Sequence, residues 1–311
     1  MEKSENSYPP VIPLDGDVDY ARVEECLEVF LRRYDFIERI YVGRSIRGRD
    51  LCCVRLGRSD APPILYVGTH HGMEHITSAL LLRFINEYCE SLHAGVRMYG
   101  VGMEYLFSER CIYVLPMLNP DGVELSLHGA EKESPLYERL LKMNGGDDFT
   151  HWQANERGVD LNHNYNAGFF EYKALEKENE IYGGGPTKYS GEYPESEPET
   201  AALCRLIRTV EPELILTLHS QGEEIYYTNG GQCPRASRRI GRIISELSGY
   251  TLSEPDGTAA YGGLTDWFIA EYGKPSFTIE CGRGVNPLPK DNFFKIYARL
   301  REVLFRAPIL V

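Results

Sequence analysis

The chain has 311 residues, of which 42% are hydrophobic and 25% are charged, so it can bury the core of a large α/β enzyme. Its 33 Lys and Arg against 46 Asp and Glu give a net charge of −13, which disfavours binding to nucleic acid or to an anionic membrane surface. No apolar run approaches the roughly 20 residues that span a bilayer.

The beginning of the chain carries no recognisable export signal. Residues 1–19 lack the apolar core and the small-residue cleavage site of a secretory signal, and we expect them to form an extended segment. As the sequence stands we expect a cytoplasmic protein, although a longer exported precursor would leave the same mature sequence. No internal repeat or linker divides the chain, which predicts one domain over residues 1–311.

Segments of helical period alternate along the chain with short apolar runs bounded by Gly, Pro or Asn. Runs that are almost entirely apolar are typical of strands covered on both faces. In chain order we predict a helix over 21–34 with Asp17 or Asp19 as its cap, strands over 37–43, 51–57 and 63–68, a helix over 76–92, a strand over 111–118, a helix over 196–210, a strand over 213–219, helices over 235–247 and 264–272, a strand over 276–281 and a helix over 291–305. This alternation predicts a largely parallel or mixed sheet between helical layers.

Residues 120–200 have a different composition. They contain few apolar runs and many Gly, Asn, Tyr and acidic residues. In an α/β domain such stretches usually form surface loops around a binding site, and we expect irregular loops here.

The eight cysteines are scattered and form no CxxC pair. Most of them lie inside apolar stretches. This distribution predicts free, buried thiols in a reducing compartment and argues against a disulfide framework.

His71 and Glu74 lie three residues apart, where the strand over 63–68 gives way to a helix. Side chains at this spacing share a face, so an imidazole and a carboxylate can bind one ion, and ligands collect at the carboxyl ends of strands. A lone HxxE is nevertheless common, and a solvated loop explains it as well. His70 and His75 flank the pair, and we interpret them as residues of the pocket wall or as residues that support the ligands, because His71 is the one that shares the face of Glu74.

His219 ends an apolar strand, and a third ligand at a strand end completes a plausible metal site. Two histidines and one glutamate with an open fourth position form a typical catalytic zinc site. Such a site needs a carboxylate that takes a proton from water. Glu280, near the end of the strand over 276–281, is interpreted either as this base or as half of a structural ion pair, because its burial is costly without a partner.

Five motifs follow one another along the chain: His71-Gly-Met-Glu74, Asn119-Pro-Asp-Gly122, Gly158-Val-Asp-Leu-Asn162, Leu218-His219-Ser220 and Ser276-Phe-Thr-Ile-Glu280. In this order the chain resembles the zinc carboxypeptidase family over roughly residues 35–305. The resemblance implies an α/β/α sandwich around an eight-stranded mixed sheet, in agreement with the predicted strands. It also implies one Zn²⁺ bound by His71, Glu74 and His219. By the same likeness Glu280 is the general base, and Asp160 orients a ligand imidazole.

The chain departs from ordinary family members in the residues that grip the substrate. Those members carry Asn-Arg-Asn where this chain has Asn162-His163-Asn164. Histidine lacks the guanidinium fork that binds a carboxylate through two hydrogen bonds.

A second departure concerns the oxyanion. Family members carry an arginine after a tryptophan, whereas here Gln153 follows Trp152, so Gln153 or Arg157 is left as the candidate for oxyanion stabilisation. The position of the tyrosine that closes over the substrate is held by Thr258, and Tyr261 is the candidate replacement.

Longer segments narrow the resemblance to one subgroup. WQANERGVDLN, LHSQGEEIYY, YGGLTDWFI and SFTIECGRGVNPLP resemble bacterial γ-D-glutamyl–diamino acid peptidases, which cut cell-wall stem peptides. This implies hydrolysis of a γ-D-glutamyl bond to meso-diaminopimelate or Lys in a muropeptide. Arg283 and Asn286 then face a substrate carboxylate, unless Arg283 is an exposed structural residue. The full set expected to bind substrate is Asn162, His163, Gln221, Tyr261, Thr265 and Arg283.

Three other functions remain open from the sequence: an ordinary C-terminal metallocarboxypeptidase, a deacylase of small acyl-amino acids and a non-catalytic peptide-binding protein. The NPDG and GRGVNPLP segments favour a peptidase over a deacylase. Gln153 favours the binding protein, but the presence of the ligands and of Glu280 argues against it. The expected partner is a peptide or muropeptide, while the oligomeric state and the use of another divalent metal stay open.

Overall fold

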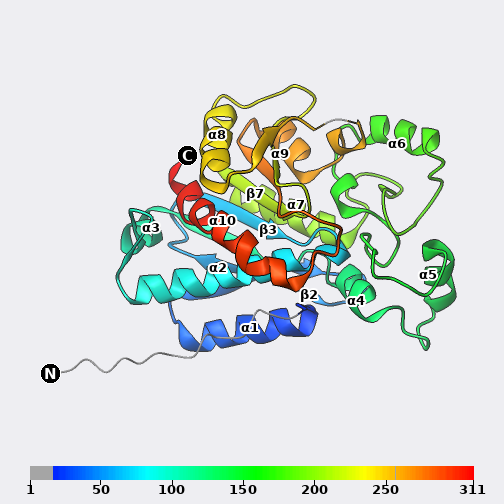
Figure 1. Cartoon of the computed structure of the whole chain (residues 1–311), viewed down its shortest axis with the longest axis horizontal. Helices are drawn as coiled ribbons and strands as arrows, with labels where there is room; N and C mark the ends of the chain where they lie inside the picture. The colour runs from blue at the N-terminus through cyan, green and yellow to red at the C-terminus, as the bar shows by residue number, and fades with distance from the viewer. Residues whose placement is uncertain (1–16, 256) are drawn as a thin grey trace.

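The computed structural model describes residues 17–255 and 257–311, and its centre is an eight-stranded mixed sheet (Figure 1). The strands, in their order across the sheet, are β1 (Ile37–Arg44), β2 (Asp50–Leu56), β6 (Cys111–Leu115), β3 (Pro63–Gly68), β7 (Leu214–His219), β10 (Ser276–Glu280), β8 (Glu224–Tyr226) and β9 (Thr251–Ser253). The four central strands β6, β3, β7 and β10 are parallel, while β1, β2 and β8 each pair antiparallel with a neighbour. The predicted eight-stranded mixed sheet is confirmed.

Helices cover both faces of this sheet. Along β3, Ile64 and Tyr66 belong to one buried apolar core, and the alternate residues Leu65 and Val67 belong to another. The first core contains residues of α1 (Tyr20–Arg33), α2 (Ile76–His93), α3 (Met103–Glu109), α8 (Ser237–Ser248) and α10 (Phe293–Arg306), and the second contains residues of α7 (Pro198–Val210) and α9 (Leu264–Tyr272). Side chains alternate across a strand, so the two cores lie on opposite faces. The predicted α/β/α sandwich is therefore confirmed, and Figure 1 looks onto the face that α2 and α10 cover.

The predicted elements lie within a few residues of the observed ones. Asp19 caps α1 and accepts a hydrogen bond from the backbone N–H of Arg22 at 2.8 Å, so Asp19 rather than Asp17 is the cap. The strands β8 and β9 were not predicted because three residues are too few to show a period. The same holds for the two-residue pair β4 (Arg97–Met98) and β5 (Val101–Gly102). Residues 1–16 of the expected N-terminal segment, and the side chain of Thr258, lie outside the described residues.

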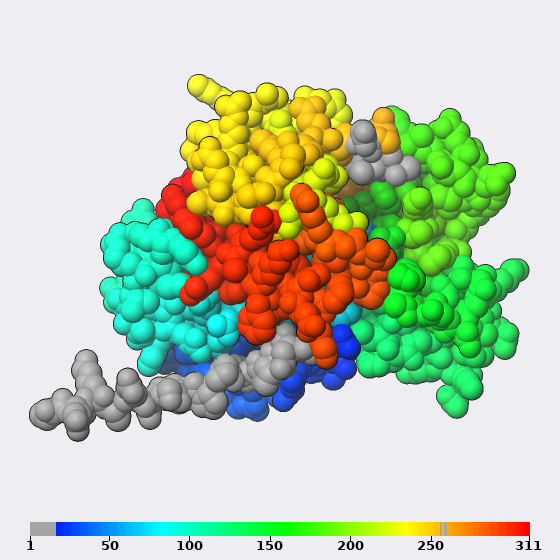
Figure 2. Space-filling model, in the orientation of Figure 1, coloured from blue at the N-terminus to red at the C-terminus, as the bar shows by residue number. Residues whose placement is uncertain are grey.

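The expectation of irregular loops over residues 120–200 is wrong in part. This stretch contains α4 (Pro120–His128), α5 (Tyr137–Asn144), α6 (Phe169–Glu178) and the start of α7. Asn119 caps α4, because its side chain accepts a hydrogen bond from Gly122 N at 2.9 Å. The apolar signal is weak because the local core is small, consisting of Leu125, Leu140, Phe149, Trp152 and Ala154. Figure 2 shows this green segment as one side of the molecule, bordering the orange residues near 285.

The structure also bears on two features of the composition, the cysteines and the apolar segments. All eight cysteines are free, and all but Cys233 are buried, as predicted. Among the described helices, none combines the length and the apolar character that a membrane crossing requires.

Candidate active site

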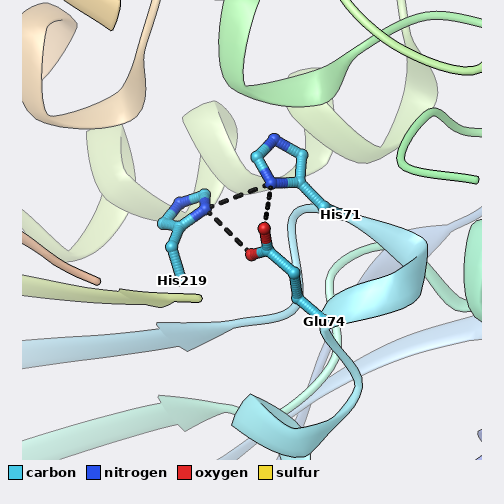
Figure 3. A group of neighbouring side chains, drawn as sticks. All are labelled: His71, Glu74 and His219. Carbon is cyan, nitrogen blue, oxygen red and sulfur yellow. Dashed lines mark hydrogen bonds and ion pairs between the residues drawn. The ribbon is translucent and has the colours of Figure 1, made fainter. Parts of the chain in front are cut away.

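His71, Glu74 and His219 converge at the carboxyl ends of β3 and β7 (Figure 3). Nδ1 of His71 lies 2.9 Å from Oε1 of Glu74, and Nδ1 of His219 lies 3.3 Å from Oε2 of Glu74. The two Nδ1 atoms are 3.4 Å apart, and the three prospective ligand atoms all lie within 4.8 Å of one another. Two ring nitrogens and a carboxylate that face a common point fit a divalent cation, and this donor set is that of catalytic zinc.

The loop that carries His71 is packed directly against the Asn119-Pro-Asp-Gly122 motif. A Cβ atom at Gly72 would lie 2.2 Å from the backbone oxygen of Gly122, so only glycine permits this approach. Asn119 also donates from Nδ2 to the backbone oxygen of His70 at 2.9 Å. These contacts hold the short 3₁₀ helix η1 (Gly72–Glu74), and with it the Glu74 carboxylate, at the end of β3.

Asp160 orients the His71 ring. It directly precedes the 3₁₀ helix η2 (Leu161–His163), and its Oδ1 accepts a hydrogen bond from Nε2 of His71 at 3.1 Å. With Nε2 occupied, Nδ1 of His71 is directed toward Glu74. Burial opposes ionisation of Asp160, but the neighbouring rings of His71 and His163 lower its pKa well below the usual range.

The cluster combines opposite charges in a buried site. Burial disfavours the charged His71 ring, yet Glu74 and Asp160 hold its pKa well above the ordinary value. Burial also opposes ionisation of Glu74, but His71 and a hydrogen bond with His219 lower the pKa of Glu74 to about 2. Asn286 donates from Nδ2 to Oε1 of Glu74 at 3.3 Å. The Glu74 carboxylate is therefore ionised and held in place, as a metal ligand must be.

The two histidines beside the cluster have structural contacts. The His70 ring stacks on the His219 ring with 5.1 Å between the ring centroids, and Nε2 of His70 lies 2.9 Å from the Tyr165 hydroxyl. His70 therefore packs against His219 and supports the position of its ring. His75 is buried at the start of α2 and is not part of the metal cluster. Neither residue lines the pocket described below, so of the two interpretations the contacts of His70 fit that of a residue supporting a ligand.

Glu280 is the last residue of β10, and its Cα pairs in register with that of His219 in the neighbouring strand. Its side chain is half-buried and accepts no hydrogen bond from any described residue. Burial, and after it the negative charge of Glu74, raises the pKa of Glu280 to about 8. A carboxylate with these properties is suited to accept and release a proton.

A pocket of about 210 Å³ opens beside the cluster. Its wall contains seven residues singled out from the sequence: His71, Gln153, Asp160, Asn162, His163, Thr265 and Glu280. The remaining residues of the wall are Thr187, Lys188, Tyr226, Thr228, Pro255, Gly263, Asp266 and Thr278. The structure therefore brings His71 of the metal cluster, the expected base and part of the expected substrate-binding set to one cavity.

The two arginines singled out from the sequence do not line this pocket. Arg157 is exposed, and its guanidinium lies 3.5 Å from Glu197. The Arg283 side chain is 72% exposed and pairs with Glu223 at 3.0 Å. Neither arginine is part of the pocket wall, so Gln153 is the oxyanion candidate that does reach the pocket.

Gln221 and Tyr261 also lie outside the pocket wall. Oε1 of Gln221 accepts a hydrogen bond from Gly284 N at 3.4 Å. The backbone oxygen of Tyr261 accepts a hydrogen bond from Nδ1 of His163 at 2.9 Å, and the His163 ring stacks on Tyr172 at 4.0 Å. Tyr261 therefore holds His163 in the pocket wall.

Sequence reasoning found Thr265 but missed the polar residues around it on the inner side of the pocket. Oγ1 of Thr265 lies 3.0 Å from Oγ of Ser276 and 2.9 Å from Oγ1 of Thr278. Asp266 is 4% exposed and accepts a hydrogen bond from Gly263 N at 3.1 Å, and burial raises its pKa to about 7. Thr278 lies two residues before Glu280 on the same strand, which was the available signal because alternate residues of a strand share a face.

Comparisons with known proteins give matches over most of the chain. A family model described as zinc carboxypeptidase matches residues 23–299. Gamma-D-glutamyl-L-diamino acid endopeptidase 1 of Lysinibacillus sphaericus is 32% identical over 90% of this chain and 69% of its own length. The uncharacterized protein YqgT of Bacillus subtilis is 33% identical over 93% of this chain and 76% of its own length. The crystal structure of the carboxypeptidase A from Helicoverpa armigera superposes with a TM-score of 0.74 over 99% of this chain and 76% of that chain; at 18% identity it supports the fold alone.

Proposed function

This chain belongs to the zinc carboxypeptidase family and is a zinc-dependent peptidase, and from that premise we propose that it hydrolyses γ-D-glutamyl–diamino acid bonds in cell-wall stem peptides. The name of the Lysinibacillus relative supports this substrate class. The structural observation that carries the proposal is the polar pocket beside the metal cluster. Hydroxyls of Thr265 and Thr278 and the Asp266 carboxylate line it, and they suit the polar side chain of a diamino acid better than an apolar one.

His71, Glu74 and His219 are the proposed zinc ligands. Their convergence within 4.8 Å and the two nitrogens plus one carboxylate support this assignment. A zinc ion bound there supplies Lewis acidity toward the scissile carbonyl. Asp160 has the task of holding the His71 ring through Nε2.

Glu280 is the proposed general base. It accepts a proton from the attacking water and delivers it to the leaving nitrogen. This transfer needs a carboxylate that lies in the pocket wall and has no permanent partner, as Glu280 does. Gln153 is the proposed donor to the developing oxyanion. The Thr187 hydroxyl already occupies its Oε1, so the amide nitrogen is the group left to donate.

His163 argues against ordinary C-terminal carboxypeptidase activity. Burial lowers the pKa of its imidazole, so the ring is neutral near pH 7 and offers no charge for gripping a terminal carboxylate. Its Nδ1 is also already bonded to the Tyr261 oxygen. An enzyme that removes single C-terminal residues needs a stronger anchor for the terminal carboxylate at this position.

The decisive experiment is product analysis by mass spectrometry. Purified protein with one zinc per chain is incubated with defined muropeptides and with ordinary α-linked peptides, and the Glu280→Gln variant is the inactive control. We expect cleavage between γ-D-glutamate and the diamino acid. Release of only C-terminal residues from α-linked peptides would make the protein an ordinary carboxypeptidase. No cleavage by the zinc-loaded protein would support a binding protein.

A further inference from the structure

We propose that Lys188 is a specificity-determining residue that binds a carboxylate of the substrate, an assignment that rests on the proposed function. Lys188 lies in the loop between α6 and α7 and is part of the pocket wall. It is 25 residues beyond His163 in the chain, and the sequence around it, PTKYSG, carries no recognised binding motif. Only the folded chain brings it to the pocket.

The charges of the pocket wall call for a cation. The wall includes three carboxylic acids, those of Asp160, Asp266 and Glu280. Among the described wall residues, Lys188 is the single Lys or Arg. The whole chain has a net charge of −13, so an anionic stem peptide approaches a surface that repels it. One ammonium group in the wall offsets this repulsion where the substrate binds.

The side chain of Lys188 has no competing partner. It is exposed, and it forms no ion pair with any residue that the structure describes. Lys173, on the neighbouring helix α6, lies instead 2.7 Å from Glu176. The two arginines expected at the substrate are likewise paired, Arg157 with a glutamate at 3.5 Å and Arg283 with another at 3.0 Å. The Lys188 ammonium is therefore the basic group left for a ligand at this pocket.

The backbone of Lys188 is held on both sides. Its N–H donates to Oδ2 of Asp160 at 3.1 Å, and its carbonyl oxygen accepts from the Tyr172 hydroxyl at 3.0 Å. Its φ is 67°, in the left-handed region that few residues other than glycine adopt. Such a conformation persists where the surroundings enforce it, and it is found preferentially at ligand sites. Asp160 thus fixes both the His71 ring and the position of Lys188.

The proposed substrate carries a matching group. A γ-linked glutamyl residue keeps its α-carboxylate free and close to the scissile carbonyl, and the diamino acid can bear a second free carboxylate. Lysine binds such an anion as a point charge through a flexible stem, without the planar fork of arginine. Either the glutamyl α-carboxylate or the carboxylate of the diamino acid can therefore be the group that Lys188 binds. Amidating one or the other distinguishes the two.

The test compares Lys188→Met with Lys188→Arg, and with Lys177→Met as the matched control, since Lys177 is an exposed lysine of α6 outside the pocket wall. Each protein is assayed on three γ-glutamyl peptides: the free acid, the glutamyl α-amide and the amide of the diamino acid. We expect Lys188→Met to raise KM for the free acid about 10- to 100-fold with kcat changed little, as for loss of one charge-assisted hydrogen bond. Lys188→Arg keeps most of the affinity, and Lys177→Met behaves as wild type.

Amidation identifies the bound carboxylate. On the peptide whose bound carboxylate has been amidated, the KM of wild type should rise by the same factor. On that peptide Lys188→Met should have the same KM as wild type. Equal losses by Lys188→Met on all three peptides would show a general structural effect and overturn the inference, as would an unchanged KM. If wild type cleaves no γ-glutamyl bond, the proposed function fails instead. Calorimetric binding of the free acid and the two amides to Glu280→Gln, with and without Lys188→Met, then decides the role of Lys188 separately.

Discussion

Glu280 and His219 are register partners in the parallel pairing of β10 with β7, so their side chains emerge next to each other at the carboxyl edge of the sheet. Adjacent strands lie about 4.8 Å apart, so the expected base and the proposed ligand start from neighbouring backbone positions. His219 is buried, whereas Glu280 is half-buried in the pocket wall. His219 is thus placed to bind an ion, and Glu280 is placed to contact a molecule in the pocket.

Glu280→Gln separates catalysis from metal binding. We expect kcat to fall about 10²- to 10⁴-fold, because the amide cannot take the proton from water. Zinc content, measured by plasma mass spectrometry, stays at one per chain, because Glu280 is outside the ligand cluster. The control is Glu271→Gln, an exposed residue of α9 that lies outside the pocket wall and should retain activity. A similar loss in both variants would contradict the assignment.

Asp160→Asn tests the orientation of His71. An asparagine oxygen still accepts the hydrogen bond but no longer supports charge on the ring, so zinc affinity should fall about 10- to 100-fold. Competition with a chromophoric chelator measures this affinity. Asp147→Asn, at an exposed position, serves as the control. Unaltered zinc affinity in Asp160→Asn would mean that the 3.1 Å contact with His71 does not tune the site.

Metal removal should destabilise the fold, because a ligand that binds only the native state raises the midpoint of thermal unfolding. We expect a chelator to lower the Tm of the wild-type protein and added zinc to restore it, in differential scanning fluorimetry. His219→Asn should abolish this response. His128→Asn should keep the response of the Tm to chelator and zinc. His128 belongs to a second, more exposed group of possible metal ligands, together with Asp19 and Glu124. The reverse pattern would move the zinc to that second group.

Glu199 predicts a pH dependence of stability away from the metal site. It is fully buried in the first turn of α7, and burial together with Asp121 and Glu197 raises its pKa to about 8. In the unfolded chain its pKa is roughly 4.3. Because the pKa of Glu199 is higher in the folded protein than in the unfolded chain, Glu199 contributes its full share to the free energy of unfolding below about pH 4. This share is lost as the pH rises toward 8.

Glu199→Gln mimics the protonated side chain and should remove this loss. Relative to wild type, the variant should gain on the order of 1–3 kcal/mol in the free energy of unfolding between pH 5 and pH 8. Urea unfolding at both values measures the difference, and Glu178→Gln, at an exposed position of α6, should change nothing. Parallel behaviour of wild type and Glu199→Gln across this range would show that Glu199 is ionised in the native protein.

The sequence alone determined the layers of the fold and the residues that meet at the metal cluster. Apolar runs and helical periods mark the central strands and most helices, because burial on both faces imposes these patterns. His71, Glu74, His219 and Glu280 lie at or just after strand ends, and parallel strands bring their carboxyl ends to one edge. The order of elements made a shared site possible, and the resemblance of the five motifs to the zinc carboxypeptidase family was needed to predict that these four side chains come together.

Only the tertiary structure decided which loop residues line the pocket beside the metal cluster. Arg157 was a candidate for oxyanion stabilisation and Arg283 for substrate binding, but each pairs with a glutamate outside the pocket wall. Lys188 carried no signal in the sequence, yet a hydrogen bond to Asp160, 28 residues earlier, brings it into that wall. A loop has no period that sets the direction of its side chains, so hydrogen bonds to distant residues determine which of them reach the site.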